Sequence, residues 1–128
     1  MTLMLTPKAA LLLSTITMAA IDGELDRNEI AIINRLDGFS LSGEWDLAIS
    51  VWEVSSVEEC IILIAQTLSS TQQRVAMANM VDIAMADGSF DKNENVLLRA
   101  YANAFDVLDE DVERIVDVIT IKNDKSLF

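Results

Sequence analysis

The sequence Asp-Gly-Glu-Leu-Asp-Arg-Asn-Glu at residues 22–29 recurs as a close copy, Asp-Gly-Ser-Phe-Asp-Lys-Asn-Glu, at residues 87–94. The copies lie 65 positions apart, and five of their eight positions are identical. Such an internal repeat indicates two equivalent structural units. In each copy, Gly suits the end of one helix and Asp-x-x-Glu suits the start of the next. Each copy therefore predicts the corner of a helical hairpin.

Helical signals continue on both sides of the first copy. Thr6-Pro7 has the pattern of an N-cap followed by Pro at the first helical position, and the helix should run to about Asp22. Asp26 should start a second helix that Gly38 closes. After a loop, Ser42 should cap a short third helix with helically spaced apolar residues, namely Trp45, Ala48, Ile49 and Trp52.

The rest of the chain predicts four more helices. Three capping-box patterns should open three of them, at Ser56-x-x-Glu59, Ser70-x-x-Gln73 and Asp91-x-x-Glu94. Asp109 should cap the last, whose buried side would be Val112, Ile115, Val116 and Ile119. Residues 122–128 are expected to fray.

These elements predict an all-α fold of about seven helices in a single domain, residues 1–128. The two helical hairpins around the repeated turns should be related by pseudo-twofold symmetry and form a compact bundle. The first, fourth and fifth helices are the most apolar, so they should form its centre.

The overall composition excludes several classes of function. A formal net charge of −12 without a basic stripe argues against binding to nucleic acid or to anionic membranes. The absence of His makes a zinc site improbable, and the single Cys60 excludes an internal disulfide. The apolar stretch at residues 9–21 is too short to cross a bilayer. These features predict a cytoplasmic protein without membrane insertion.

Two interpretations of the repeated turn remain open. In the structural one, Gly ends a helix, Leu25 or Phe90 fills the core, and the acids cap the following helix. In the other, three carboxylates in each turn bind Ca²⁺ or another hard divalent cation. That interpretation assigns six metal ligands: Asp22, Asp26, Glu29, Asp87, Asp91 and Glu94.

A true EF-hand is not predicted, although the turn matches the second half of its loop. Loop positions 1 and 3 would fall on Met18 and Ala20 in the first copy and on Ile83 and Met85 in the second. None of these side chains is an oxygen ligand for Ca²⁺.

The turns Ala20-Ile21-Asp22-Gly23 and Met85-Ala86-Asp87-Gly88, each with Glu seven residues after the Asp, resemble the TerB-like tellurite-resistance family. The resemblance covers about residues 6–121 and is best in the second repeat. It implies an all-helical domain whose acidic residues bind divalent metal, and a role in bacterial stress response within membrane-associated assemblies. Carried over by position, its acidic set is Asp22, Glu29, Asp87 and Glu94. Ile21 departs from the family's preferred Ala.

Other side chains are assigned to structure. Cys60 should be a buried thiol, and the six Met residues should fill the core. Trp45 and Trp52 share one helix face, which suits the core or a partner-binding surface. Asp82 should lie on an exposed face or extend the acidic site.

The sequence thus predicts a non-catalytic acidic module that binds cations and docks protein partners with a basic surface or within a membrane-associated complex. The alternative is a plain helical interaction domain whose acids only cap helices. An enzyme is not predicted, because His and a phosphate-binding glycine loop are both missing.

Overall fold

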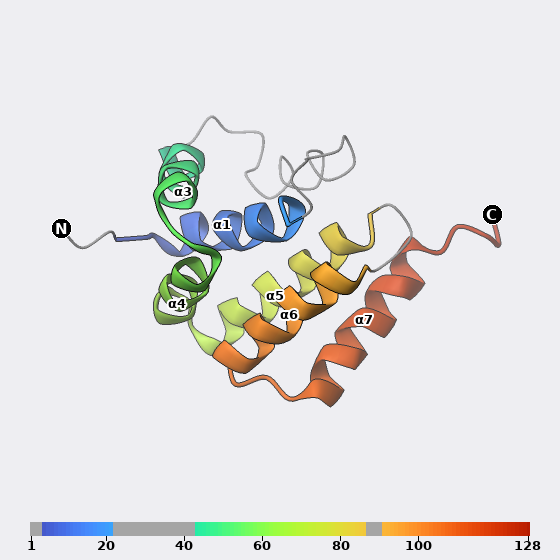
Figure 1. Ribbon diagram of the computed structural model, residues 1–128. Helices are drawn as coiled ribbons and strands as arrows, with labels where there is room; N and C mark the ends of the chain where they lie inside the picture. Colours follow the sequence, from blue (N-terminus) through green and yellow to red (C-terminus); the bar gives the residue numbers. More distant parts are fainter. Residues whose placement is uncertain (1–3, 22–42, 87–90) are drawn as a thin grey trace.

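The computed structural model describes residues 4–21, 43–86 and 91–128 (Figure 1). Within these ranges every regular element is a helix, in agreement with the predicted all-α class. The helices are α1 (Pro7–Ala19), α3 (Gly43–Val54), α4 (Val57–Thr67), α5 (Ser70–Ala84), α6 (Lys92–Ala104) and α7 (Asp109–Asn123). The helix expected from Asp26 to Gly38 lies outside the described residues.

Helix α1 begins as predicted, with Thr6 as N-cap and Pro7 in the first turn. The Thr6 hydroxyl oxygen accepts a hydrogen bond from the backbone N–H of Ala9 at 3.2 Å, and the hydroxyl donates to the Glu44 carboxylate at the start of α3. The helix ends at Ala19, three residues before the predicted end. The cap thus starts α1 and also joins it to α3.

Two predicted caps, those of α5 and α7, were wrong. Helix α5 is capped by Ser69 with Gln72, one residue before the predicted Ser70 with Gln73. Gln73 instead donates to the carbonyls of Ala65 and Leu68 at the end of α4, at 3.1 and 3.2 Å. Both registers fit the capping-box pattern, and the contact of Gln73 with α4 is compatible with only one of them.

Helix α7 also differs from its prediction. Its N-cap is Leu108 without a side-chain cap, and Asp109 is the first helical residue. The helix continues to Asn123, so Lys122 and Asn123 are helical and not frayed. Both side chains bind Asp82 of α5, which holds this last turn in place.

Helices α1 and α5 form the centre of the molecule. Ten residues of α1 are buried, and α5 buries seven. Helix α4, expected beside them, contacts α1, α3 and α6 and buries only Cys60, Ile61 and Ile64, and its Ile62 is 55% exposed. The prediction that α4 joins α1 and α5 at the centre is met in part: α4 packs on α1 but buries fewer of its residues, because a continuous run of apolar residues does not show which of them will be covered.

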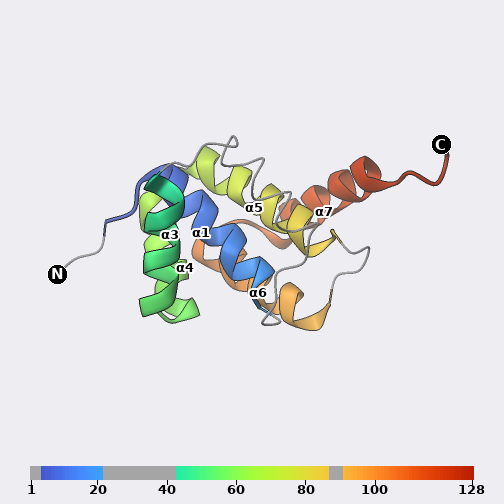
Figure 2. The same ribbon diagram turned by 90° about the horizontal axis from the view of Figure 1, so that it is seen from above.

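Helices α1 and α3 are arranged in a similar way to helices α5 and α7. Helices α1 and α5 end 65 residues apart, at Ala19 and Ala84, and the next residues have nearly the same backbone angles, φ −90° and ψ 2° for Ala20 and φ −98° and ψ 5° for Met85. Helix α1 packs on α3 as α5 packs on α7, and α1 packs on α5. In both views α3 and α4 lie at one end of the molecule and α7 at the other (Figures 1 and 2).

Helix α6 ends in a tight turn that leads into α7. The backbone N–H groups of Asp106 and Val107 donate to the carbonyls of Asn103 and Ala102, at 3.2 and 2.8 Å. Asp106 has a φ of 55°, the left-handed conformation in which such helix ends usually place Gly. This bond pattern sets the direction in which the chain enters α7.

No helix in residues 4–21, 43–86 and 91–128 has both the length and the hydropathy needed to span a membrane.

Candidate functional site

The described end of the second Asp-Gly turn is a complete capping box at the start of α6. The Asp91 carboxylate accepts from the backbone N–H of Glu94 at 2.8 Å, and the Glu94 carboxylate accepts from the backbone N–H of Asp91 at 3.2 Å. Glu94 is only 6% exposed. This geometry confirms the predicted cap and places two carboxylates beside one helix N-terminus, where the helix dipole favours negative charge.

The same geometry occurs at two other helix starts. Ser56 with Glu59 caps α4, and Ser69 with Gln72 caps α5. The bonds from Ser56 lower the pKa of the Glu59 carboxyl, because they stabilise its charged form. At α5, two neutral side chains make the same pair of bonds, so capping alone does not require carboxylates.

The structure places two of the six predicted metal ligands, Asp91 and Glu94, and brings them together in one turn. The other four, Asp22, Asp26, Glu29 and Asp87, lie outside the described residues. Within the ranges that the structure does describe, no three His, Cys, Asp or Glu side chains form a group that could hold a metal ion.

A groove of about 570 Å³ lies beside this turn. Its lining comes from the end of α5, from the start and middle of α6, and from the middle of α7: Met85, Asp91, Lys92, Asn95, Leu98, Arg99, Glu113, Val116 and Asp117. The sequence prediction missed the groove. The only signal was that Glu113 and Asp117 lie four apart on a helix, which is typical of an ordinary solvated face.

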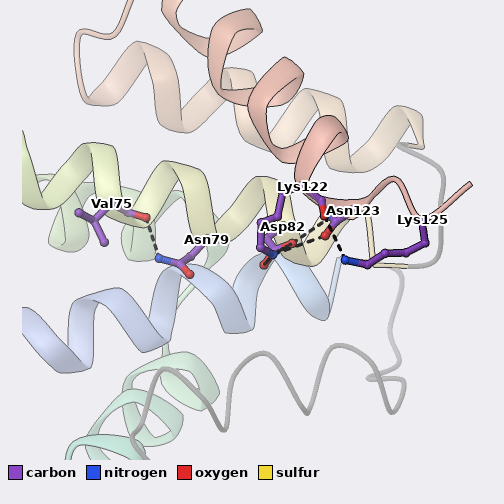
Figure 3. A network of polar contacts seen from close by, with 6 residues as sticks. All are labelled: Val75, Asn79, Asp82, Lys122, Asn123 and Lys125. Carbon is purple, nitrogen blue, oxygen red and sulfur yellow. Dashed lines mark hydrogen bonds and ion pairs between the residues drawn. The ribbon is translucent and has the colours of Figure 1, made fainter. Parts of the chain in front are cut away.

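Asp82 is not on an exposed face, and that prediction was wrong. It is 9% exposed, and its carboxylate accepts from Lys122 Nζ at 3.1 and 3.3 Å and from Asn123 Nδ2 at 3.1 Å (Figure 3). Asp82 therefore joins α5 to the last turn of α7.

The buried side chains confirm most structural assignments. Cys60 is fully buried, and burial raises the pKa of its thiol, with the nearby Glu59 charge adding to the effect. Met18, Met77 and Met80 are in the core, although Met4 is 81% exposed. Of the two Trp residues, Trp45 packs against the core and Trp52 is 39% exposed.

One polar contact within the core was not predicted. The hydroxyls of Thr17 in α1 and Tyr101 in α6 lie 2.6 Å apart. Thr17 also donates to the carbonyl of Ser14 at 2.8 Å, which uses its one hydroxyl hydrogen, so Tyr101 is the donor in the contact between them. Burial raises the pKa of Tyr101, which keeps this donor protonated.

Comparison with curated proteins and with solved structures finds no significant match. The family model described as "Tellurite resistance protein TerB" matches residues 48–117, which include the second Asp-Gly turn and every residue that lines the groove. The resemblance predicted from the sequence is thus confirmed over this segment. Because the match spans more than half of the 128 residues, the chain belongs to the TerB family.

Proposed function

We propose that this TerB-family chain is a non-catalytic, cation-responsive module that docks other proteins. Its Asp-Gly turns would bind Ca²⁺ or another hard divalent cation. The observation that carries the proposal is the cap of α6. Two carboxylates accept the capping hydrogen bonds there, whereas a hydroxyl and a side-chain amide accept them at the cap of α5. Two like charges in one turn repel, and a bound cation would remove that cost.

Capping and cation binding are compatible in the same side chains. A carboxylate offers two oxygens and about four acceptor positions, so an N–H and a metal ion can share it. In the sequence, Asp87 precedes Asp91 by four residues and would supply a third oxygen ligand. By the repeat, Asp22, Asp26 and Glu29 would form the equivalent site.

The alternative is a helical interaction domain that binds no metal. The observation that favours it is that the carboxylates of Asp91 and Glu94 already accept from backbone N–H groups. Capping alone would then explain why acids occur at these positions.

Melting temperatures in millimolar Ca²⁺, Mg²⁺ and Mn²⁺, compared with NaCl of equal ionic strength, distinguish the cation-binding module from the plain interaction domain. Binding to the native state at about 100 times Kd stabilises it by about 2.7 kcal/mol, a rise of roughly 5–10 °C. Asp91→Asn with Glu94→Gln keeps the cap and should remove the rise at this turn; Asp26→Asn with Glu29→Gln tests the other.

Glu53→Gln with Glu58→Gln is the matched control, since it removes two exposed charges elsewhere and should retain the rise. If the wild type melts at the same temperature in divalent cation and in matched NaCl, the cation proposal fails and the plain interaction domain remains. A rise that survives unchanged when both turns carry these substitutions together would place the cation somewhere else.

The proposal also includes a cytoplasmic, non-catalytic role in stress response. A single buried thiol suits a reducing compartment. The sequence has no His to act as a general base, and its only Cys is buried rather than accessible to a substrate.

A further inference from the structure

Helix α7 is attached to its neighbours near both ends. At its start, Arg99 of α6 binds Asp109 at 3.1 Å. At its end, Lys122 and Asn123 bind Asp82 of α5 (Figure 3). The groove beside the second Asp-Gly turn lies between these two attachments. Because its walls are fixed at both ends, the groove is already formed without a ligand.

The floor of the groove is apolar. Leu98 is 1% exposed, and Met85 and Val116 are partly buried against the core. Methionine adapts its shape readily and is common at surfaces that bind apolar side chains. The groove has a volume of about 570 Å³.

The walls differ in charge. On the α7 wall, Glu113 and Asp117 lie one turn apart, and in the described part of the chain neither makes an ion pair. On the α6 wall, the charge of Arg99 is already met by Asp109, and Lys92 lies next to Asp91 at the end of the groove. The accessible charge along α7 is therefore negative, with an apolar floor beside it.

We propose that this groove binds an amphipathic helical segment of a protein partner, with apolar side chains on Met85, Leu98 and Val116 and basic side chains facing Glu113 and Asp117. The inference deepens the docking role proposed above by naming its surface and the kind of partner. Helices commonly bind through an apolar stripe laid in such a groove. The net charge of −12 favours a basic partner and disfavours a second copy of this chain.

The probe is a fluorescein-labelled peptide of about 14 residues, made of Leu and Lys in an order that gives a helix with one apolar face. Binding is followed by fluorescence anisotropy in EDTA at about 150 mM NaCl, so the result does not depend on cation binding. A peptide of the same composition, with its order scrambled to remove the apolar face, reports charge attraction alone and should bind at least about tenfold more weakly.

Two pairs of variants locate the site. Asn95→Trp fills the groove without changing charge and should weaken binding about tenfold, whereas Asn103→Trp, at an exposed α6 position outside the groove, should not. Glu113→Gln with Asp117→Asn should weaken binding several-fold more than Glu53→Gln with Glu58→Gln, which removes the same charge elsewhere.

Each contrary result overturns the proposal. Equal binding by the two Trp variants would show that the groove is not the site. Equal losses in the two acidic pairs, or equal binding of the scrambled peptide, would show attraction to the overall charge only. Sedimentation that shows a dimer dissociated by Asn95→Trp would assign the groove to a second copy. Failure of the cation experiment would leave each of these results interpretable, because none uses a divalent ion.

Discussion

At the scale of single residues, polar groups inside the core have partners. In the described residues, no buried side-chain nitrogen or oxygen lacks a hydrogen bond. The hydroxyls of Thr17 and Tyr101 form one such pair, and removing one of them has a different effect from removing the other. Thr17 retains its bond to Ser14 if the Tyr101 hydroxyl is removed, whereas in the described part of the chain the Tyr101 hydroxyl bonds to Thr17 alone.

We expect Thr17→Val to lower the free energy of unfolding by more than Tyr101→Phe does. Thr17→Val leaves a buried hydroxyl without an acceptor, which costs about 1–3 kcal/mol, whereas Tyr101→Phe loses about 1 kcal/mol. Urea denaturation measures both. The double variant should recover part of the Thr17→Val loss, because the orphaned hydroxyl is gone. Equal losses in the two single variants would contradict the assigned direction of the bond.

Glu59 links stability to pH. Its pKa is lowered in the folded state by the bonds from Ser56, so its stabilising effect is present above its ordinary value of 4.5 and is lost as pH falls through the lower folded value. We expect the wild type to be more stable than Glu59→Ala at neutral pH, with a difference that shrinks below about pH 4.5. Denaturation at several pH values measures this, and a constant difference would contradict it.

At the scale of elements, the starts of the helices are set mainly by local hydrogen bonds. The boxes at Ser56, Ser69 and Asp91 each join residues three apart in sequence. Such bonds can be predicted from sequence because both partners belong to one turn. The ambiguity at residues 69–73, where two registers fit, was resolved only by the contacts of Gln73 with the end of α4.

We expect Ser69→Ala to destabilise the protein by about 1 kcal/mol, since it removes the N-cap of α5. Ser70→Ala should change stability by less than about 0.5 kcal/mol, because Ser70 is an exposed residue in the first turn. Thermal or urea unfolding of the two variants tests the register. A larger loss for Ser70→Ala would favour the register predicted from sequence.

At the scale of the whole molecule, charge opposes compactness. A net charge of −12 on 128 residues repels itself in the folded state, and few ion pairs offset it in the described part of the chain. The buried apolar residues of α1 and α5 must outweigh that repulsion. Salt should therefore act on the fold as a whole, apart from any specific cation.

We expect the melting temperature to rise when NaCl increases from about 10 to about 150 mM, because screening shortens the range of the repulsion. Glu53→Gln with Glu58→Gln should show a smaller rise, since less repulsion is left to screen. Scanning calorimetry at the two concentrations measures both effects. A melting temperature that falls with salt would show that attractive ion pairs outweigh the repulsion.

The all-helical class, the TerB resemblance, the buried Cys60 and the caps at Thr6, Ser56 and Asp91 could all be predicted from the amino-acid sequence. These depend on apolar periodicity and on bonds within one helical turn, which a short stretch of sequence specifies. The metal-binding role of all six turn residues stays a prediction, and four of them, Asp22, Asp26, Glu29 and Asp87, lie outside the described residues.

The contacts between residues far apart in the sequence could be learned only from the packed helices. The packing paired Asp82 with Lys122 and Asn123, and Thr17 with Tyr101. It also formed the groove between α6 and α7, whose walls come from three helices. Residues 40 or 84 positions apart meet only when helices pack in one particular way. That packing depends on the shapes of many side chains at once, which no local pattern records.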